Sequence, residues 1–229
     1  MTRPDPRRLT TRVLLAALAL STLGALGGCI VGAAIGGMAE SYRRTGKHKV
    51  EAEYQGLRGK SYAVVVTADR LVQAQNPGLI GRVTTVVNDR LAHPDNNVGA
   101  SAYIPSQDLL NVLYETPQWP AMARGEVAKL LGVQRLIVIE LTEYHLHEPG
   151  NQYVWEGAAA GSVSVYESDS GLPDDPIYDK AIRVTFPDGT GYMSTEMSQA
   201  TVTSELSRRF INRCAWLFYD HEEENVIPY

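Results

Sequence analysis

The stretch AKLLGVQRLIV, residues 128–138, decides the fold. Val127, Leu130 and Leu131 recur at helical spacing, and Gly132 follows them as a helix C-cap because glycine takes the left-handed conformation without strain. Residues 135–146 then predict a strand that opens with the apolar run LIVI. A helix that ends on glycine and passes at once into an apolar strand is typical of a mixed α/β domain.

The segments before this stretch continue the alternation of strands and helices. SYAVVVT, residues 61–67, is an unbroken β-branched run, which predicts a strand buried on both faces. A helical face runs from Leu79 to Leu91 and ends at His93-Pro94. Residues 98–104 predict a weaker strand, and Pro105-Ser106 opens a helix whose apolar side carries Leu109, Leu110 and Leu113.

The segments after it predict a hairpin, one more strand and a long helix. The turn 149–151 joins the strand 135–146 to a long strand at 154–166. An acidic loop at 167–176 leads to a strand at 181–186, and residues 198–219 carry a helical apolar stripe. The predicted fold class is α/β (α+β), a single domain with a mixed sheet of about four to five strands flanked by helices.

The amino-terminal segment has the pattern of an export signal. Arg7, Arg8 and Arg12 precede an apolar run that leads to Leu26-Gly27-Gly28-Cys29. This segment resembles a bacterial lipoprotein signal, which implies cleavage between Gly28 and Cys29 and a covalent lipid on the Cys29 sulfur. Two or three acyl chains make a durable anchor, because each buried methylene contributes about 0.8 kcal/mol. Ile30 stands where a retention aspartate would sit, which favours the outer membrane, facing the periplasm.

A second interpretation is an uncleaved membrane-spanning helix. The uncharged stretch continues from Val13 to Ala39, and Gly24, Gly28, Gly32 and Gly36 recur every four residues. Small residues at that spacing let transmembrane helices approach closely. Under either interpretation the membrane lipid is a partner of the chain and the rest of the protein is tethered to the bilayer.

The expected organisation follows from these signals. Residues 1–28 form the signal peptide, 29–60 the lipidated cysteine and a flexible tether, 61–221 the globular domain and 222–229 an acidic tail. Without residues 1–28 the chain has 17 basic and 25 acidic residues, so its net charge falls from −5 to −8. An acidic chain argues against nucleic acid as a partner. Cys214 is then the only other cysteine, and its apolar neighbours indicate a buried side chain.

Two segments carry a family resemblance. Both resemble parts of one envelope α/β module. Residues Ala128 to Val138 look like its helix, glycine and hydrophobic strand, and residues Ser162 to Gly171 look like its strand that ends in an acidic turn. The module occurs in curli-secretion lipoproteins, penicillin-binding-protein activator lipoproteins and the amino-terminal domain of TolB. The resemblance implies a scaffold that binds other envelope proteins or assembles with itself, and it supplies no catalytic residues.

Organised catalytic motifs are absent from the sequence, which contains neither a Gly-x-Ser-x-Gly elbow nor a His-Glu-x-x-His helix. We therefore expect a protein that is not an enzyme and has no cofactor beyond the lipid on Cys29. His145, His147 and Glu148 are weak candidates for a metal site, since imidazoles and carboxylates bind divalent metals. They motivate the alternative of a membrane-tethered, metal-dependent hydrolase.

Three aromatic residues are candidates for binding a partner. Tyr153 and Trp155 lie at the start of the predicted long strand, and Trp119 lies between two prolines. Exposed aromatic side chains are frequent hot spots of protein interfaces, whereas buried ones belong to the core. The sequence leaves both possibilities open for these three residues.

Overall fold

The computed structural model describes residues 46–189 and 191–224. Residues 49–222 belong to one compact unit, which carries the main sheet and its helices. The predicted signal peptide, the cleavage site at Gly28 and the lipidation site at Cys29 lie outside the described residues. Among the residues that the structure does describe, none of the helices is both long and apolar enough to cross a membrane.

The centre of the fold is a five-stranded mixed sheet with the strand order β3-β2-β4-β6-β7. Strand β2 runs parallel to both of its neighbours, β3 and β4. Strand β6 is antiparallel to both of its neighbours, β4 and β7. The strands are β2 (Ser61–Ala68), β3 (Ala102–Tyr103), β4 (Arg135–His145), β6 (Gly157–Glu167) and β7 (Tyr178–Phe186). The predicted α/β class and mixed sheet are therefore confirmed, including the hairpin of β4 with β6.

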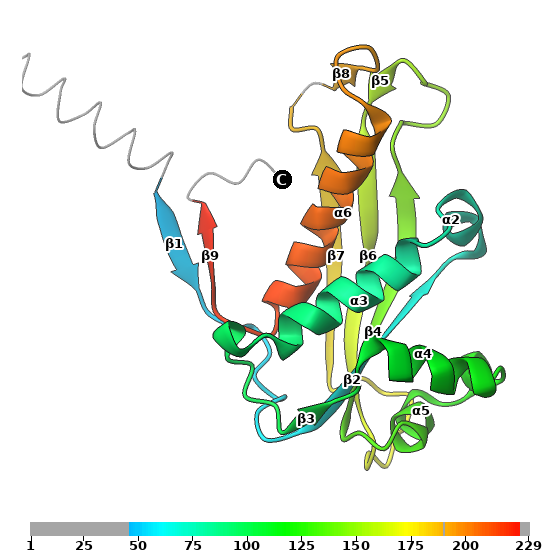
Figure 1. The fold of residues 1–229 in the computed structure, drawn as a ribbon, viewed down its shortest axis with the longest axis vertical. Coiled ribbons are helices and arrows are strands. Elements are labelled where there is room, and N and C mark those ends of the chain that lie inside the picture. Colours follow the sequence, from blue (N-terminus) through cyan, green and yellow to red (C-terminus); the bar gives the residue numbers. More distant parts are fainter. Residues whose placement is uncertain (1–45, 190, 225–229) are drawn as a thin grey trace, which may run out of the picture. The chain divides into compact units, whose positions relative to one another are not determined.

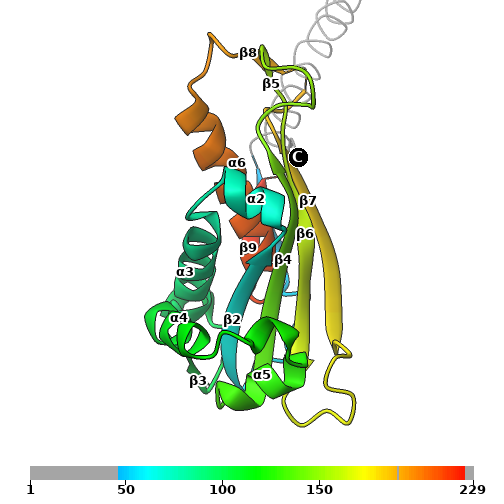
Figure 2. The ribbon, with the colours of Figure 1, turned by 90° about the vertical axis from the view of Figure 1, so that its right-hand side faces the viewer.

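Helices α3 (Leu79–Ala92) and α6 (Gln199–Trp216) cover one face of this sheet, as Figures 1 and 2 show. The predicted stripe of α6 is buried there, and Phe210 is only 1% exposed. Ser198 caps α6, because its hydroxyl accepts a hydrogen bond from the Thr201 amide at 3.2 Å. The short helix α2 (Arg70–Gln75), which the sequence did not reveal, follows β2 directly.

Helices α4 (Ser106–Glu115) and α5 (Arg124–Leu130) build a smaller core on the other face. Their buried residues pack against β2 and the first half of β4. Gly132 has a φ of 68°, so the predicted glycine after α5 takes the left-handed conformation. Beyond these helices the same face of the sheet exposes Glu140 of β4 and Arg183 of β7.

The elements that differ from the prediction are mostly short or irregular. The strand expected at 98–104 is reduced to the two residues of β3, and the strand expected at 154–166 is divided at Glu156 into β5 (Val154–Trp155) and β6. The helix expected from about residue 121 begins only at Arg124, because the 3-10 helix η2 (Trp119–Ala121) stands before it. Another 3-10 helix, η1 (Pro94–Asn96), follows α3.

Packing against the core begins before residue 61, where the folded domain was expected to start. Leu57 is 1% exposed and belongs to the core of α3 and α6, and the Tyr54 amide donates to the Leu217 carbonyl at 2.8 Å. Strand β1 (Lys47–Val50) pairs with β9 (His221–Glu224) in a two-stranded sheet. The later residues of the expected tether are thus ordered.

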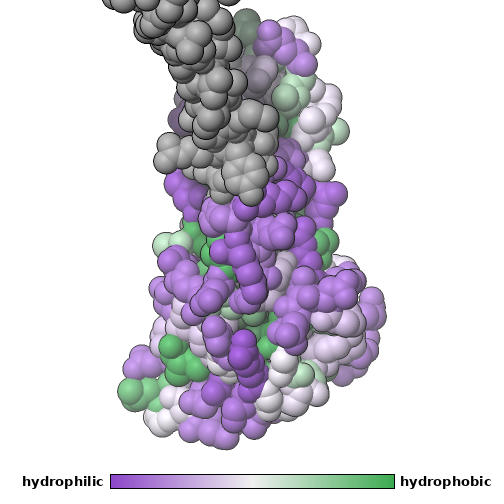
Figure 3. Space-filling model, turned by 90° about the vertical axis from the view of Figure 1, so that its left-hand side faces the viewer, coloured by the Kyte–Doolittle hydropathy of each residue, from purple (hydrophilic) through white to green (hydrophobic). Residues whose placement is uncertain are grey.

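Most of the surface in Figure 3 is hydrophilic, with hydrophobic residues in small separate groups. Single exposed apolar residues are normal on a soluble domain, whereas a group of them at one place indicates contact with a partner. At one end of the sheet, exposed aromatic side chains from distant positions in the chain come together at the paired strands β5 (Val154–Trp155) and β8 (Tyr192–Met193).

Candidate functional site

Two very short strands form a projection at one end of the main sheet. Strands β5 and β8 (Tyr192–Met193) pair in an antiparallel sheet of their own, with Val154 opposite Met193 and Trp155 opposite Tyr192. Figures 1 and 2 show this pair beyond the end of β4, β6 and β7. We call Tyr153, Val154, Tyr192 and Met193 the aromatic tip.

The aromatic tip exposes large hydrophobic side chains. Tyr153 is 76% exposed, Met193 53% and Tyr192 46%. Large apolar side chains in water cost free energy that burial recovers, at about 25 cal/mol per Å² of apolar area. Tyrosine and methionine are enriched in protein interfaces, because tyrosine combines a rigid apolar ring with a hydroxyl and methionine adapts its shape. The tip therefore has the composition of a binding surface.

Trp155 anchors the tip to the body of the protein. Its side chain is 5% exposed, and its indole N–H donates to the Met197 carbonyl at 2.8 Å. The His147 ring stacks on the indole with centroids 4.2 Å apart, and its Nδ1 donates to the Val154 carbonyl at 2.8 Å. Trp155 is thus a support of the binding surface rather than part of it.

Further hydrogen bonds fix the backbone of the tip. The Met193 amide donates to a Glu196 carboxylate oxygen at 2.9 Å, and the Tyr153 amide donates to Asn151 Oδ1 at 3.0 Å. The Ser194 amide donates to the Tyr153 carbonyl at 2.8 Å, which extends the pairing of β5 with β8. A surface held in this way loses little conformational entropy when it binds.

The charges around the tip have one sign. Residues 147–157 and 187–197 contain Glu148, Glu156, Asp188 and Glu196 but no lysine or arginine. Glu148, Glu156 and Glu196 are exposed, whereas Asp188 pairs with the buried Arg209. The tip therefore presents aromatic rings beside carboxylates, a combination that attracts cationic groups through both the charges and the ring faces.

The predicted partner-binding residues do not all lie together. Tyr153 and Trp155 both belong to the projection, but Trp119 lies in η2, where it is half-buried against the smaller core. Tyr192 and Met193 were missed, because a two-residue strand after the turn 187–189 has no detectable periodicity. Their only signal in the sequence is a tyrosine next to a methionine in an otherwise polar stretch.

The candidate metal ligands are engaged with other groups. His145 Nε2 lies 2.8 Å from Glu143 Oε1, and Arg183 also binds the Glu143 carboxylate. His147 is held by Trp155 and Val154, while Glu148 is exposed. Within residues 46–189 and 191–224, no three histidine, cysteine or acidic side chains are grouped so that they could hold a metal ion.

The acidic loop and Cys214, both noted in the sequence, make contacts within the folded domain. Asp174 of the acidic loop accepts a hydrogen bond from the Arg124 amide at 2.9 Å, at the start of α5. Cys214 is a free and fully buried thiol, and burial raises its pKa. A thiol in this state is protonated at neutral pH, so Cys214 is a core residue, as its neighbours in the sequence predicted.

The ion pair between Glu143 and Arg183 should make the stability of the fold depend on pH. Hydrogen bonds from Arg183, and to a lesser extent from His145, lower the pKa of Glu143 below its ordinary value of 4.5. A lowered pKa stabilises the folded state above pH 4.5, and this contribution disappears as the pH falls through the folded-state pKa. Because both side chains are partly exposed, Arg183→Met should cost only about 0.5 kcal/mol at pH 7.

Urea unfolding at pH 7 and at pH 2 measures this effect. The difference between wild type and Arg183→Met should vanish at the lower pH, where the carboxyl group is protonated in both states. Lys180→Met, which removes another exposed ion pair on β7 at Glu53, is the matched control for the loss of a surface charge. An equal loss at both pH values for Arg183→Met would contradict the assignment.

Comparison with known proteins gives structural likeness only. No model of a protein family and no curated protein matches the sequence. Lipoprotein GNA1162 from Neisseria meningitidis is similar in structure at 11% identity, over 68% of this chain and 97% of that one, with a TM-score of 0.43. The PelC dodecamer subunit from Paraburkholderia phytofirmans is similar at 10% identity, over 76% and 96%, with a TM-score of 0.42.

The carboxy-terminal domain of LpoB from Salmonella enterica is a third similar structure. Its identity is 15%, its coverage 64% of this chain and 90% of that one, and its TM-score 0.34. The similar structures thus include a bacterial lipoprotein and the LpoB domain. At these scores the likeness carries no statement about function.

Proposed function

We propose that this chain is a lipid-anchored protein of the bacterial envelope, which acts as a noncatalytic scaffold by binding another protein through the aromatic tip. The observation that carries the proposal is the exposure of Tyr153, Tyr192 and Met193 on a projection that Trp155 and several backbone hydrogen bonds hold in place. Hot spots of interfaces are typically rigid aromatic anchors of this kind.

The anchor is proposed from the sequence alone. The order Leu26-Gly27-Gly28-Cys29 after an apolar run supports cleavage before Cys29 and lipidation of its sulfur. Ile30 supports delivery to the outer membrane, with the domain facing the periplasm. Mass spectrometry of the mature amino terminus from native membranes tests this directly. A diacylglyceryl cysteine as the first residue would support the proposal. A retained Met1 would contradict the lipid anchor and favour the uncleaved membrane-spanning helix.

The tip also indicates the chemistry of its partner. Glu148, Glu156 and Glu196 are exposed in the segments that carry the exposed rings, and residues 147–157 and 187–197 contain no lysine or arginine. A complementary protein surface would carry lysine or arginine, since opposite charges across an interface direct association and cations bind aromatic faces. Binding to this surface should therefore weaken as the salt concentration rises.

Site-specific photocrosslinking in living cells tests the tip as the contact surface. A benzophenone amino acid at position 153 or 193 of the full chain should yield one discrete crosslinked product. The same amino acid at position 114 is the control, because Tyr114 is 87% exposed on α4, apart from the tip. Products from position 114 alone would refute the tip as the site, and a product of two copies of this chain would identify the partner as the protein itself.

Substitution of the tip should affect binding and leave the fold unchanged. Tyr153→Ser removes an exposed ring, so the unfolding free energy should change by no more than about 0.5 kcal/mol. The affinity for the crosslinked partner should fall about 10-fold or more, which is the effect of removing one hot-spot side chain. Tyr114→Ser should change neither quantity. Equal affinities of the two variants for the purified partner would contradict the proposal.

A further inference from the structure

A second site lies at the end of the sheet opposite to the aromatic tip. A cavity of about 500 Å³ opens between the carboxy-terminal end of α3 and the edge strand β3. Residues 91–94 and 97–103 line it, together with Tyr62 from β2. Figures 1 and 2 place β3 at one end of the sheet and β5 and β8 at the other. A cavity of this size is typical of sites that bind small molecules or peptide segments.

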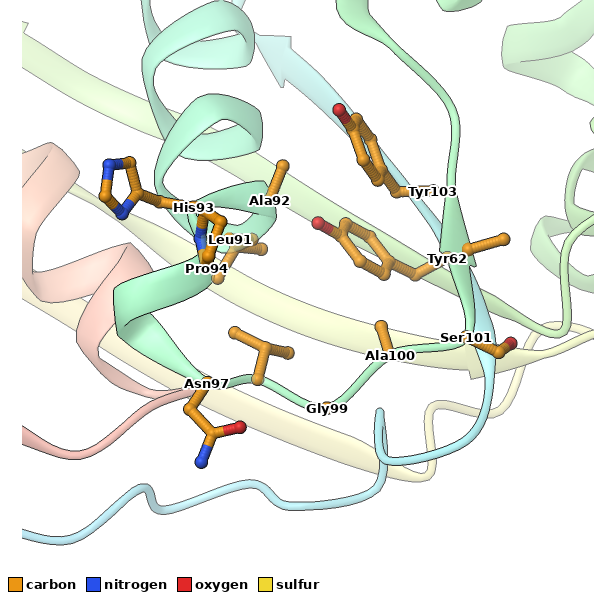
Figure 4. A pocket seen from close by; sticks show the side chains of 12 residues that line it. Tyr62, Leu91, Ala92, His93, Pro94, Asn97, Gly99, Ala100, Ser101 and Tyr103 are labelled. Carbon is orange, nitrogen blue, oxygen red and sulfur yellow. The ribbon is translucent and has the colours of Figure 1, made fainter.

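The hydroxyl of Tyr62 has no hydrogen-bond partner in this cavity. The Tyr62 side chain is 1% exposed, and its oxygen is buried and unpaired. Figure 4 shows the ring directed across the cavity, with the hydroxyl toward Leu91 and Pro94. Burial raises the pKa of Tyr62, so the hydroxyl is a neutral donor. By contrast, the buried Tyr144 hydroxyl bonds to Ser207 Oγ at 2.9 Å and to the Thr203 carbonyl at 3.2 Å.

The walls of the cavity are nearly free of charge and combine apolar side chains with polar groups, among them Asn97 and Ser101. Leu91 and Val98 are buried apolar residues, and Ala92, Pro94 and Ala100 complete the apolar part of the lining. Apart from the two tyrosines, His93 is the only ionisable residue of the lining, and Figure 4 shows its ring pointing away from the cavity. A charged ligand would lose its hydration here without gaining an opposite charge. The lining therefore selects an uncharged ligand that offers both apolar and hydrogen-bonding groups.

The loop around the cavity is fixed by its own hydrogen bonds. The Gly59 amide donates to the Gly99 carbonyl at 2.8 Å, and the Ser101 amide donates to the Lys60 carbonyl at 3.0 Å. Asn96 Nδ2 donates to the Arg90 carbonyl at 2.7 Å, at the end of α3. The cavity is therefore formed in advance of binding, which lowers the entropy cost of holding a ligand.

The edge of the sheet forms one side of the same cavity. Strand β3 is the last strand in the sheet order, with β2 as its partner, and both of its residues are exposed. Extended peptides bind at such edges by adding a strand, while alternate side chains enter neighbouring pockets. The Tyr103 ring stacks on Tyr62 with centroids 6.0 Å apart and is 47% exposed, so it forms an accessible wall of the cavity beside the Tyr62 ring.

We propose that this cavity binds an uncharged segment of a partner protein in extended conformation. The segment lies along β3, inserts an aliphatic side chain between Leu91 and Val98, and accepts a hydrogen bond from the Tyr62 hydroxyl through a backbone carbonyl. The cavity shares no residue with the aromatic tip, so an experiment can refute one of the two proposed binding sites without refuting the other.

The test uses the full-length protein in detergent micelles and the blocked tripeptide acetyl-Val-Leu-Val-amide as the probe. Titration calorimetry should give saturable binding to wild type, and the same peptide with lysine in place of leucine should not bind. Tyr62→Phe should weaken binding about 5- to 10-fold, the effect of one hydrogen bond. Its melting temperature should stay equal or rise, because the substitution removes a buried group that lacks a partner.

Tyr144→Phe is the matched control, because it removes a buried hydroxyl that is hydrogen-bonded and remote from the cavity lining. It should lower the melting temperature and leave peptide binding unchanged. Failure of wild type to bind the tripeptide, or equal binding by wild type and Tyr62→Phe, would overturn the proposal. Tyr153→Ser should bind the tripeptide like wild type, which separates this site from the aromatic tip.

Discussion

Gly161→Ala is expected to lower the unfolding free energy by about 3 kcal/mol, at the upper end of the range for overpacking a core. Gly161 lies in β6, opposite Leu141 of β4. A β-carbon built on Gly161 would lie 2.1 Å from the Glu140 carbonyl oxygen and 3.1 Å from the Leu141 Cα. Both atoms belong to backbone, so the strain cannot be relieved by rotating a side chain. The register of β4 against β6 shifts directly after this point, between Leu141 and Glu143.

Urea unfolding of Gly161→Ala beside Gly171→Ala measures this effect. Gly171 lies in the acidic loop, and a β-carbon there would meet no atom within 4 Å. Both variants lose the same flexibility of the unfolded chain, so the difference between their midpoints isolates the close approach of the two strands. A loss below about 0.5 kcal/mol for Gly161→Ala would show that β4 and β6 separate easily at this position.

Long regular elements were predictable from the sequence because one physical signal dominates each of them. The run SYAVVVT is buried on both faces in β2, and the apolar stripe of residues 198–219 became α6. Gly132 ended the helix before β4, as the left-handed cap requires. Leu110, by contrast, was placed on the apolar side of α4 but is 41% exposed, because this helix covers only the edge of the sheet.

The candidate site was only partly predictable, because its parts come from distant positions in the chain. Tyr153 was identified as an aromatic residue at a hairpin end, but Tyr192 joins it only through the pairing of two-residue strands. The unpaired hydroxyl of Tyr62 was also hidden, since an apolar run of strand length predicts burial without indicating which polar groups lack partners. Spacing in a sequence reports local geometry, and these features depend on contacts between residues far apart.

Asp188→Asn is expected to lower the unfolding free energy by about 3 kcal/mol. Its partner Arg209, in α6, has a side chain that is only 6% exposed. Two guanidinium nitrogens of Arg209 lie 2.5 and 2.6 Å from the Asp188 carboxylate, and a third lies 3.1 Å from Glu205. The guanidinium also lies 4.7 Å above the Phe186 ring. Loss of the Asp188 charge would take away a carboxylate that contacts two nitrogens of this buried cation.

The pair also connects α6 to the turn that leads into β8. Asp188 belongs to the turn 187–189, and Arg209 additionally donates to the Thr185 carbonyl at 2.8 Å. The loosened turn of Asp188→Asn should therefore be cut faster by a protease under native conditions, within residues 187–197. Tyr153→Ser, which leaves this ion pair intact, is the control for that measurement and should be cut at the wild-type rate.

The double variant Asp188→Asn with Arg209→Met separates the penalty of burying the Arg209 charge without the Asp188 charge from the value of the pair itself. Methionine fills the space of the arginine stem without carrying a charge, so the double variant should be more stable than Asp188→Asn alone. It should recover roughly half of the loss or more, because the largest part of the cost is the buried guanidinium that has lost the Asp188 charge rather than the missing attraction. Urea unfolding of wild type, both single variants and the double variant gives the coupling energy. Additive losses in that cycle would mean that Arg209 and Asp188 stabilise the fold separately, which would contradict the assigned role of the pair.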